Sequence, residues 1–246
     1  MSNNFGKIFA KTKNLHDKLD KHPFLIRYAN DTFTLQDRHR HLQELLPIYE
    51  AIEKKMIELG FQSELVDELA ETLTQAEKIK EDIAFMEKKS NIQFKKLSQT
   101  EKTKEYIKKI NQMTDPHEIL AHFYVRILGD FHGGPLTKMH VISLLENRNI
   151  RSQTDIVEDV KFYTFGKNAS EKFHTWLNNR ELPEKSFQYA NDAFQVHLDI
   201  FDEMEQTRSN SSFFKTCSTL FNPKNAAAVV TASIVATTAF ALSYTK

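Results

Sequence analysis

The sequence predicts an all-α protein, and three observations support that prediction. Apolar residues recur at helical spacing along almost the whole chain. No segment shows a convincing alternation of apolar and polar residues, the pattern typical of a half-buried strand. Glycine and proline each occur only six times in 246 residues, which restricts tight turns and favours long helices over a many-stranded sheet.

The composition excludes several classes of function. Lysine plus arginine equals aspartate plus glutamate at 33 each, so there is no basic excess and we expect no nucleic-acid partner. The single cysteine, Cys217, rules out a disulfide framework within one chain and any zinc or iron–sulfur site built from several cysteines. Lys7, Lys11 and Lys13 interrupt the N-terminal segment, which therefore does not read as a secretory signal.

The N-terminal part is expected to hold a short helix followed by a long one. Apolar spacing predicts the short helix around residues 5–15. The long helix covers about residues 34–60, and Pro47 inside it should bend or weaken it. His39 and His41 lie in a charged stretch of this helix, so we expect both to be solvated.

Further amphipathic helices are expected along the rest of the chain. Their ranges are residues 64–89, 100–113, 169–181 and 184–208. Between them, Thr114-Asp115-Pro116 reads as a helix start with proline in the first turn. The apolar pattern that follows continues past a cluster of three glycines to Leu145.

The C-terminal segment differs from the rest of the chain. Residues 226–244 run for 19 positions without a charge, close to the roughly 20 residues that span a bilayer as a helix. A helix without a polar face has nothing to orient it on a soluble core. We therefore expect a membrane anchor at 226–244, a linker at 209–225 and a folded domain at 1–208. The alternative is a buried C-terminal helix of the globular domain.

Residues Ala121–Gly134, with the sequence A-H-F-Y-V-R-I-L-G-D-F-H-G-G, carry the strongest chemical signal. Gly129 and Gly133 are four residues apart, so they share one face of a helix. That bare face would let a flat ligand approach the backbone, with Asp130 as a buried or half-buried acid beside it. Pro135 and the glycines also permit a bend. Close packing against another helix is the alternative, and spacing alone leaves both interpretations open.

This run resembles the distal helix of the haem oxygenases, especially the animal-type enzymes, which carry a similar A-H-x-Y-x-R-x-L-G-D-x-S-G-G. Three further stretches are similar and follow in the same order: Lys11–His16, Asp82–Phe85 and Phe162–Phe165. The apolar tail is similar too, and the resemblance covers about residues 8–206. It implies a single helical domain that holds haem between a proximal helix and a glycine-kinked distal helix.

The resemblance also implies which residues form the site. On the proximal side, His16 would bind the haem iron and Asp20 would orient its ring. On the distal side, Asp130 would hold water near the bound dioxygen, in a network completed by Tyr49, Tyr106 and Arg126. The other residues expected at the haem are Lys13, Tyr124, Gly129, Gly133, Gly134, His174, Phe194 and His197. Without the resemblance, His16 would read as a surface histidine and each tyrosine as a core residue.

Several positions depart from the family pattern. His132 stands where the family has a serine, and His197 where it has an asparagine of the distal network. Two basic positions that hold the haem propionates are His174 and Asn178 in this chain. We hypothesise that His132 joins Asp130 and His197 in a rebuilt proton relay. The alternatives are a ring that points outward, or a sixth ligand that blocks dioxygen.

The implied activity is oxidative cleavage of haem to biliverdin, Fe²⁺ and CO, with O₂ as the oxidant. The sequence carries no flavin, nicotinamide or iron–sulfur motif, so electrons are expected from an NADPH-dependent reductase or a ferredoxin system. The tail would hold the domain on a membrane, facing the cytosol. One alternative is a non-catalytic haem-binding or haem-sensing protein on the same fold. Another is a helical interaction protein that no longer binds haem.

Overall fold

A computed structural model describes residues 3–29, 32–89, 93–95, 97–146 and 160–209. Within these ranges every regular element is helical, which confirms the all-α prediction. The elements are α1 (Asn4–Asp20), α2 (Pro23–Ala29), α3 (Leu35–Glu58), the 3₁₀ turns η1 (Phe61–Ser63) and η2 (Asp67–Leu73), α4 (Gln75–Lys89), α5 (Glu101–Gln112), α6 (Pro116–Glu146), α8 (Ala169–Asn178) and α9 (Lys185–Ser209).

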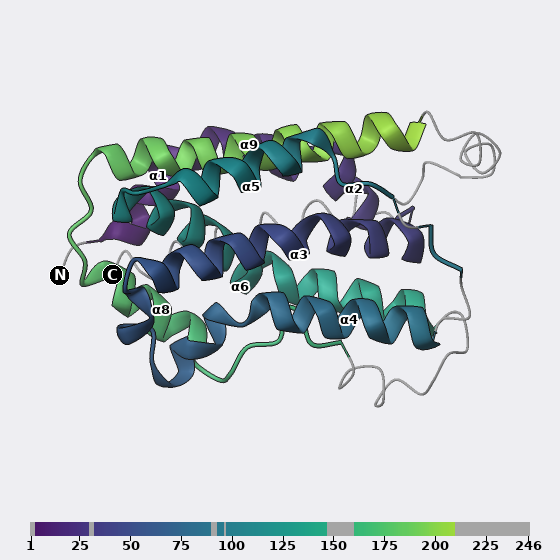
Figure 1. Cartoon of the computed structure of the whole chain (residues 1–246), viewed down its shortest axis with the longest axis horizontal. Helices are drawn as coiled ribbons and strands as arrows, with labels where there is room; N and C mark the ends of the chain where they lie inside the picture. The colour runs from purple at the N-terminus through teal and green to yellow at the C-terminus, as the bar shows by residue number, and fades with distance from the viewer. Residues whose placement is uncertain (1–2, 30–31, 90–92, 96, 147–159, 210–246) are drawn as a thin grey trace.

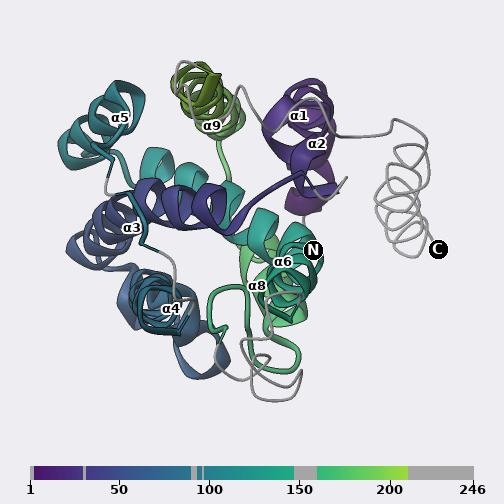
Figure 2. The ribbon, with the colours of Figure 1, turned by 90° about the vertical axis from the view of Figure 1, so that its right-hand side faces the viewer.

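The helices form three layers, which are clearest when the molecule is viewed from its end (Figure 2). Helices α5, α9 and α1 make the upper layer in Figure 1, α3 and α6 the middle one, and α4 and α8 the lower one. Helix α9 packs on both α1 and α6, and α3 packs on α4, α5 and α6. Apolar side chains from all three layers fill the spaces between them and form one continuous core.

The charged start of α3 is buried, so the expectation that His39 and His41 are solvated is wrong. Arg38, His39, Arg40 and His41 are all below one-tenth exposed. Helix α3 lies in the middle layer and is covered on several sides, so these polar side chains need partners inside the protein. His39 Nε2 lies 2.9 Å from a carboxylate oxygen of Glu87, and His41 Nδ1 lies 3.0 Å from the Tyr28 hydroxyl.

Two boundaries of the predicted helices also differ. Residues 64–89 are not one helix, because η2 precedes α4, which begins only at Gln75. The buried carboxylate of Glu53 on α3 accepts a hydrogen bond of 2.9 Å from the backbone N–H of Ala76 and so satisfies the first turn of α4. Helix α8 ends at Asn178 rather than at residue 181. Helix α3 continues through Pro47.

Helix α6 runs without interruption from Pro116 to Glu146, through the three glycines and Pro135.

The first residues of helix α1 attach it to the end of α8. The Asn4 side-chain amide donates to the backbone oxygens of Leu177 at 2.8 Å and Arg180 at 2.7 Å. These contacts fix the start of α1 against the end of α8.

The predicted linker and membrane anchor at 209–225 and 226–244 lie outside the described residues, except for Ser209 at the end of α9. No helix in the described ranges has the length and apolar character needed to cross a membrane.

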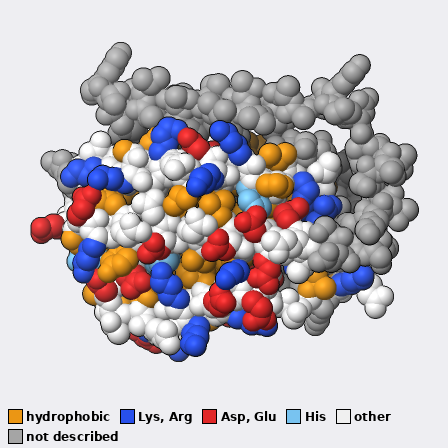
Figure 3. Space-filling model, turned by 90° about the horizontal axis from the view of Figure 1, so that it is seen from above, with side chains coloured by type: hydrophobic (Ala, Val, Ile, Leu, Met, Phe, Trp, Pro, Cys, Tyr) orange, Lys and Arg blue, Asp and Glu red, His pale blue; other side chains and the backbone are white. Residues whose placement is uncertain are grey.

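On the face shown in Figure 3, acidic and basic side chains are interspersed, in keeping with the balanced net charge.

Candidate haem site

The last turns of α1 place an oriented histidine at the surface of the helix. His16 Nδ1 lies 3.1 Å from a carboxylate oxygen of Asp20, one helical turn further on. The hydrogen bond to Asp20 raises the pKa of His16, although burial opposes this rise. When the neutral ring donates from Nδ1 to Asp20, its Nε2 carries the lone pair that a metal ion could accept.

Two aromatic rings flank this histidine. The ring centroids of Phe9 on α1 and Phe194 on α9 each lie 6.0 Å from that of His16, in edge-on arrangements. The His16 side chain is one-third exposed, so it remains accessible to a ligand. The structure therefore brings together His16, Asp20 and Phe194, three of the residues that the resemblance implies at the site.

The glycine face of α6 has open space in front of it. A Cβ atom added at Gly129 or at Gly133 would meet no atom within 4 Å outside its own stretch of helix. Gly134 differs, because a Cβ there would come within 2.7 Å of the Tyr163 ring. Contact with the Tyr163 ring therefore explains Gly134, whereas the bare backbone at Gly129 and Gly133 suits the approach of a flat ligand.

Behind this face lies a buried carboxyl group. Asp130 is 4% exposed, and the Tyr49 hydroxyl donates a short hydrogen bond to its Oδ2. Arg126 donates to the same hydroxyl oxygen from Nε at 3.3 Å and from Nη2 at 3.2 Å. Burial raises the pKa of Asp130 to about 6, against the opposing effects of Arg126 and Tyr49. The carboxyl group can therefore gain or lose a proton near neutral pH.

A second buried polar group joins α5, α6 and α9. The Tyr106 hydroxyl lies 2.7 Å from Nδ1 of His122, and its ring contacts His197 edge-on at 5.9 Å. His197 Nδ1 lies 2.5 Å from the carbonyl oxygen of Ala193, to which it must donate. Its Nε2 is buried and accepts from no group in the described part of the chain. His197 therefore presents an acceptor nitrogen inside the protein.

Burial keeps both of these histidines neutral. It lowers the pKa of His122 to about 3, and lowers that of His197 well below its usual value. The positive charge of Arg126 adds to the effect on His197. The sequence prediction included Tyr106 and His197 but assigned no role to His122. The hydrogen bond to Tyr106 is the reason to include it.

His132 and His174 form a stacked pair at another part of the site. Their ring centroids are 5.5 Å apart, and Phe5 of α1 lies against both, at 5.9 Å from His132 and 4.4 Å from His174. Burial lowers the pKa of His174 to about 4. His132 thus packs against residues of α1 and α8. Asp130 instead accepts from Tyr49, and the His197 ring contacts Tyr106.

Two predicted haem contacts have other partners here. Tyr124 is fully buried and donates from its hydroxyl to the Ser186 backbone oxygen at 3.1 Å, which ties α6 to α9. Lys13 is exposed and forms an ion pair of 2.5 Å with Asp17 on the same helix. Asn178, at a predicted propionate position, accepts from the Phe5 backbone N–H at 3.1 Å.

Comparison with solved structures identifies the fold. The haem complex of heme oxygenase-1 from the cyanobacterium Synechocystis aligns with a TM-score of 0.65 at 17% identity and covers 87% of this chain and 97% of that one. The chain therefore has the haem oxygenase fold. The family profile described as Heme oxygenase matches residues 5–203, so the protein belongs to the haem oxygenase family.

Two curated relatives have similar sequences along most of the chain. Heme oxygenase 1 of Bos taurus is 25% identical over 207 residues, covering 79% of this chain and 68% of that protein. Heme oxygenase of Rhodella violacea is 25% identical over 217 residues, covering 83% of this chain and 86% of that protein. The resemblance found in the glycine run thus extends across the folded domain.

Proposed function

We propose that this protein is an active haem oxygenase, which opens haem to biliverdin and releases Fe²⁺ and CO. The observation that carries the proposal is the pairing of a bare glycine face with a buried, ionisable Asp130 on one helix. The oriented His16 on α1 supplies the complementary proximal group. The open space at Gly129 and Gly133 and the available Nε2 of His16 fit a haem group.

The proximal residues would bind and orient. His16 would hold the iron through Nε2, while Asp20 accepts from Nδ1 and fixes the tautomer. Phe9 and Phe194 would supply apolar contacts to haem beside the imidazole. When bound, haem supplies the iron that reduces dioxygen and the porphyrin carbon that is oxidised.

The distal residues would hold and move protons. With a pKa near 6, the Asp130 carboxyl can pass a proton to a nearby water and recover it at physiological pH. Tyr49 donates to that carboxyl, and Arg126 fixes the Tyr49 oxygen from the other side. This arrangement restricts the carboxyl to one orientation.

The proposal includes an external electron source and a membrane location. An NADPH-dependent reductase or a ferredoxin system would supply the electrons, because the sequence lacks motifs for a redox cofactor of its own. Residues 226–244 would anchor the domain to a membrane with the catalytic part facing the cytosol.

The test is titration of the purified protein with hemin, followed by addition of reductase, NADPH and O₂. We expect a Soret shift at one equivalent and then biliverdin absorption. Asp130→Ala should bind hemin with similar affinity and lose most of the biliverdin signal. His16→Ala should lose the ferric spectrum of the parent and recover part of it with added imidazole.

The second candidate is a haem-binding protein without turnover, and the histidines at positions 132, 174 and 197 favour it. That candidate gains support if hemin binds and no biliverdin forms with either electron source. The absence of any Soret shift would exclude both functions and leave a helical interaction protein.

A further inference from the structure

Tyr163 has a backbone conformation that bulky residues rarely adopt. Its φ is +71°, in the left-handed region. A residue with a β-carbon is sterically strained in this conformation, so the surrounding contacts must enforce it. In the described ranges the other non-glycine residues with positive φ are Asp67 and Asn168. Asn and Asp tolerate the left-handed region, whereas an aromatic residue there is unusual.

Contacts from two helices enforce this turn, which comprises residues 161–164. Asp82 of α4 accepts from the backbone N–H groups of Lys161 at 2.6 Å and Phe162 at 3.3 Å. Thr164 closes the turn by donating from its N–H to the Lys161 oxygen at 2.9 Å. Lys138 of α6 donates to the Thr164 hydroxyl at 2.5 Å. The turn is thus held from both α4 and α6.

The strained turn directs the Tyr163 ring against the glycine helix. The ring occupies the position that a side chain at Gly134 would need, with its Cδ1 atom 2.7 Å from the site of a Cβ. The residue before it, Phe162, is fully buried and contacts the Tyr49 ring edge-on at 5.6 Å. Tyr163 therefore lies next to the helix turn that carries Asp130.

A buried cation also lies over the Tyr163 ring. The Arg38 guanidinium carbon is 5.2 Å from the ring centroid, and Arg38 is fully buried. Its closest carboxylate oxygen in the described residues belongs to Asp82, at 3.7 Å from Nη2. The same aspartate thus fixes the turn and neutralises the arginine beside it.

The Tyr163 hydroxyl also interacts electrostatically with the residues of the candidate site. Burial raises the pKa of Tyr163, and the charges of Arg38 and Arg126 oppose this rise while that of Asp130 adds to it. The charged and titratable groups that act on Asp130 are Arg126, Tyr49, Arg38 and Lys78. The charges of Arg38 and Arg126 thus act on both Tyr163 and Asp130.

We propose that Tyr163 and Arg38 form a second polar arm of the distal site, in which Tyr163 is a positioning residue that orients water beside Asp130. This arm would act in the proposed reaction, so the inference rests on the proposed function. Arg126 and Tyr49 hold the Asp130 carboxyl from within the bundle. The second arm would supply the hydroxyl of the ring that packs against Gly134. The strain at Tyr163 is retained because it directs this hydroxyl.

Two measurements test the proposal, and the first needs no haem. Tyr163→Phe keeps the ring against Gly134 and removes only the hydroxyl. In the haem-free protein, carboxyl ¹³C NMR should show the titration midpoint of Asp130 moving upward by about half a pH unit or more, because a stabilising polar group is lost. Arg38→Lys should shift it in the same direction, and the double variant should show less than the sum of the two shifts. Tyr189→Phe, which removes a hydroxyl paired with Asp115, is the control and should leave the midpoint unchanged.

The second measurement is the acid–alkaline transition of the ferric haem complex, followed by its visible spectrum. Tyr163→Phe should move its midpoint upward, with unchanged hemin affinity and an unchanged melting temperature for the haem-free protein. Unchanged midpoints in both titrations would overturn the proposal. A lower melting temperature without a shift in either midpoint would also overturn it, since it would show a structural role only. If the parent does not bind hemin, the proposed function fails, while the haem-free titration still decides whether the second arm exists.

Discussion

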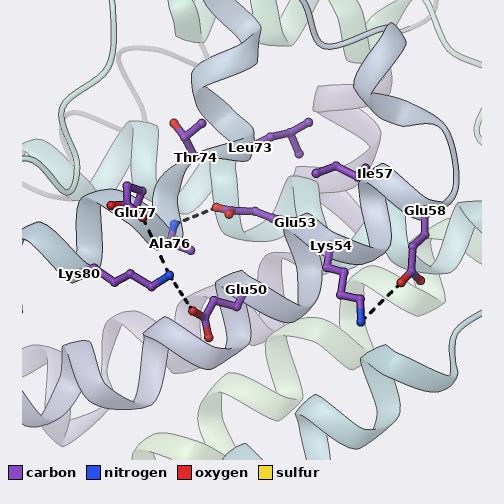
Figure 4. A pocket seen from close by; sticks show the side chains of 10 residues that line it. All are labelled: Glu50, Glu53, Lys54, Ile57, Glu58, Leu73, Thr74, Ala76, Glu77 and Lys80. Carbon is purple, nitrogen blue, oxygen red and sulfur yellow. Dashed lines mark hydrogen bonds and ion pairs between the residues drawn. The ribbon is translucent and has the colours of Figure 1, made fainter.

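At the scale of single residues, burial decides which acids keep their protons. Glu53 shows this away from the candidate site, where it lines a surface hollow between α3 and α4 (Figure 4). It is 9% exposed, and one of its carboxylate oxygens accepts from the Ala76 N–H. Burial raises its pKa to about 7. Its neighbour Glu50 is exposed and forms an ion pair with Lys80 at 3.0 Å. Glu50 is therefore an exposed control for the buried Glu53.

We predict that the difference in unfolding free energy between Glu53→Gln and the parent increases in favour of the variant as the pH rises from about 4.5 to 7. The folded protein holds the Glu53 proton more tightly than the unfolded chain, so the parent loses stability across this window. The loss is at most about 3 kcal/mol for a shift of this size. Glutamine retains an oxygen that accepts from Ala76. Urea unfolding at several pH values measures the effect, and Glu50→Gln should show no such trend. Parallel stability curves for parent and Glu53→Gln would contradict the prediction.

The relay hypothesis is also tested at single residues. His197 presents its Nε2 inside the bundle next to Tyr106, and burial keeps it neutral. We predict that His197→Asn changes the pH profile of single-turnover haem breakdown, because the polar group beside the site differs. His132→Ser tests whether His132 takes part in the relay, because it removes the imidazole that stacks on His174. If the profiles of both variants coincide with that of the parent, the relay hypothesis is wrong. A ferric parent that is low-spin and becomes high-spin in His132→Ser would identify His132 as an iron ligand.

At the scale of the elements, local periodicity predicts the helices but not their surroundings. The expected helix at 100–113 is present as α5 because Thr100 caps it, a signal readable within a few residues. The buried Arg38–His41 segment could not be predicted, because a charged stretch looks the same whether solvent or another layer covers it. The same limit applies to Gly134, whose ring partner Tyr163 is distant in sequence. Resemblance to a family identified the candidate site, but not the strained turn beside it.

Two adjacent glycines of α6 should therefore respond in opposite ways to alanine. Gly133→Ala adds a methyl group to open space and should stabilise the haem-free protein by up to about 1 kcal/mol through helix propensity. It should also weaken hemin binding, because the methyl group occupies the bare face. Gly134→Ala should destabilise the haem-free protein, since its Cβ meets the Tyr163 ring. Thermal melts and hemin titrations measure both effects. Equal changes in stability for the two variants would contradict the different roles of these glycines.

At the scale of the whole molecule, the three described layers bury a continuous core by themselves. We predict that a chain ending at residue 224 folds, remains soluble and binds hemin like the full-length protein. Circular dichroism and hemin titration measure this. The full-length protein should float with phospholipid vesicles, whereas the shortened one should not. Aggregation of the shortened chain would show that residues 226–244 complete the core, and the anchor prediction would then be wrong.

The attachment of Asn4 to the end of α8 has a consequence for synthesis. The partners of Asn4 are the backbone oxygens of Leu177 and Arg180, 173 and 176 positions further along the chain. Contacts this distant in sequence form late, because the intervening chain must close first. On the ribosome, the segment bearing His16 is made first but has no docking surface until α8 and α9 have emerged. A nascent chain therefore presents His16 without the opposing walls of the candidate site, and we expect it to capture haem only after nearly the whole domain is translated.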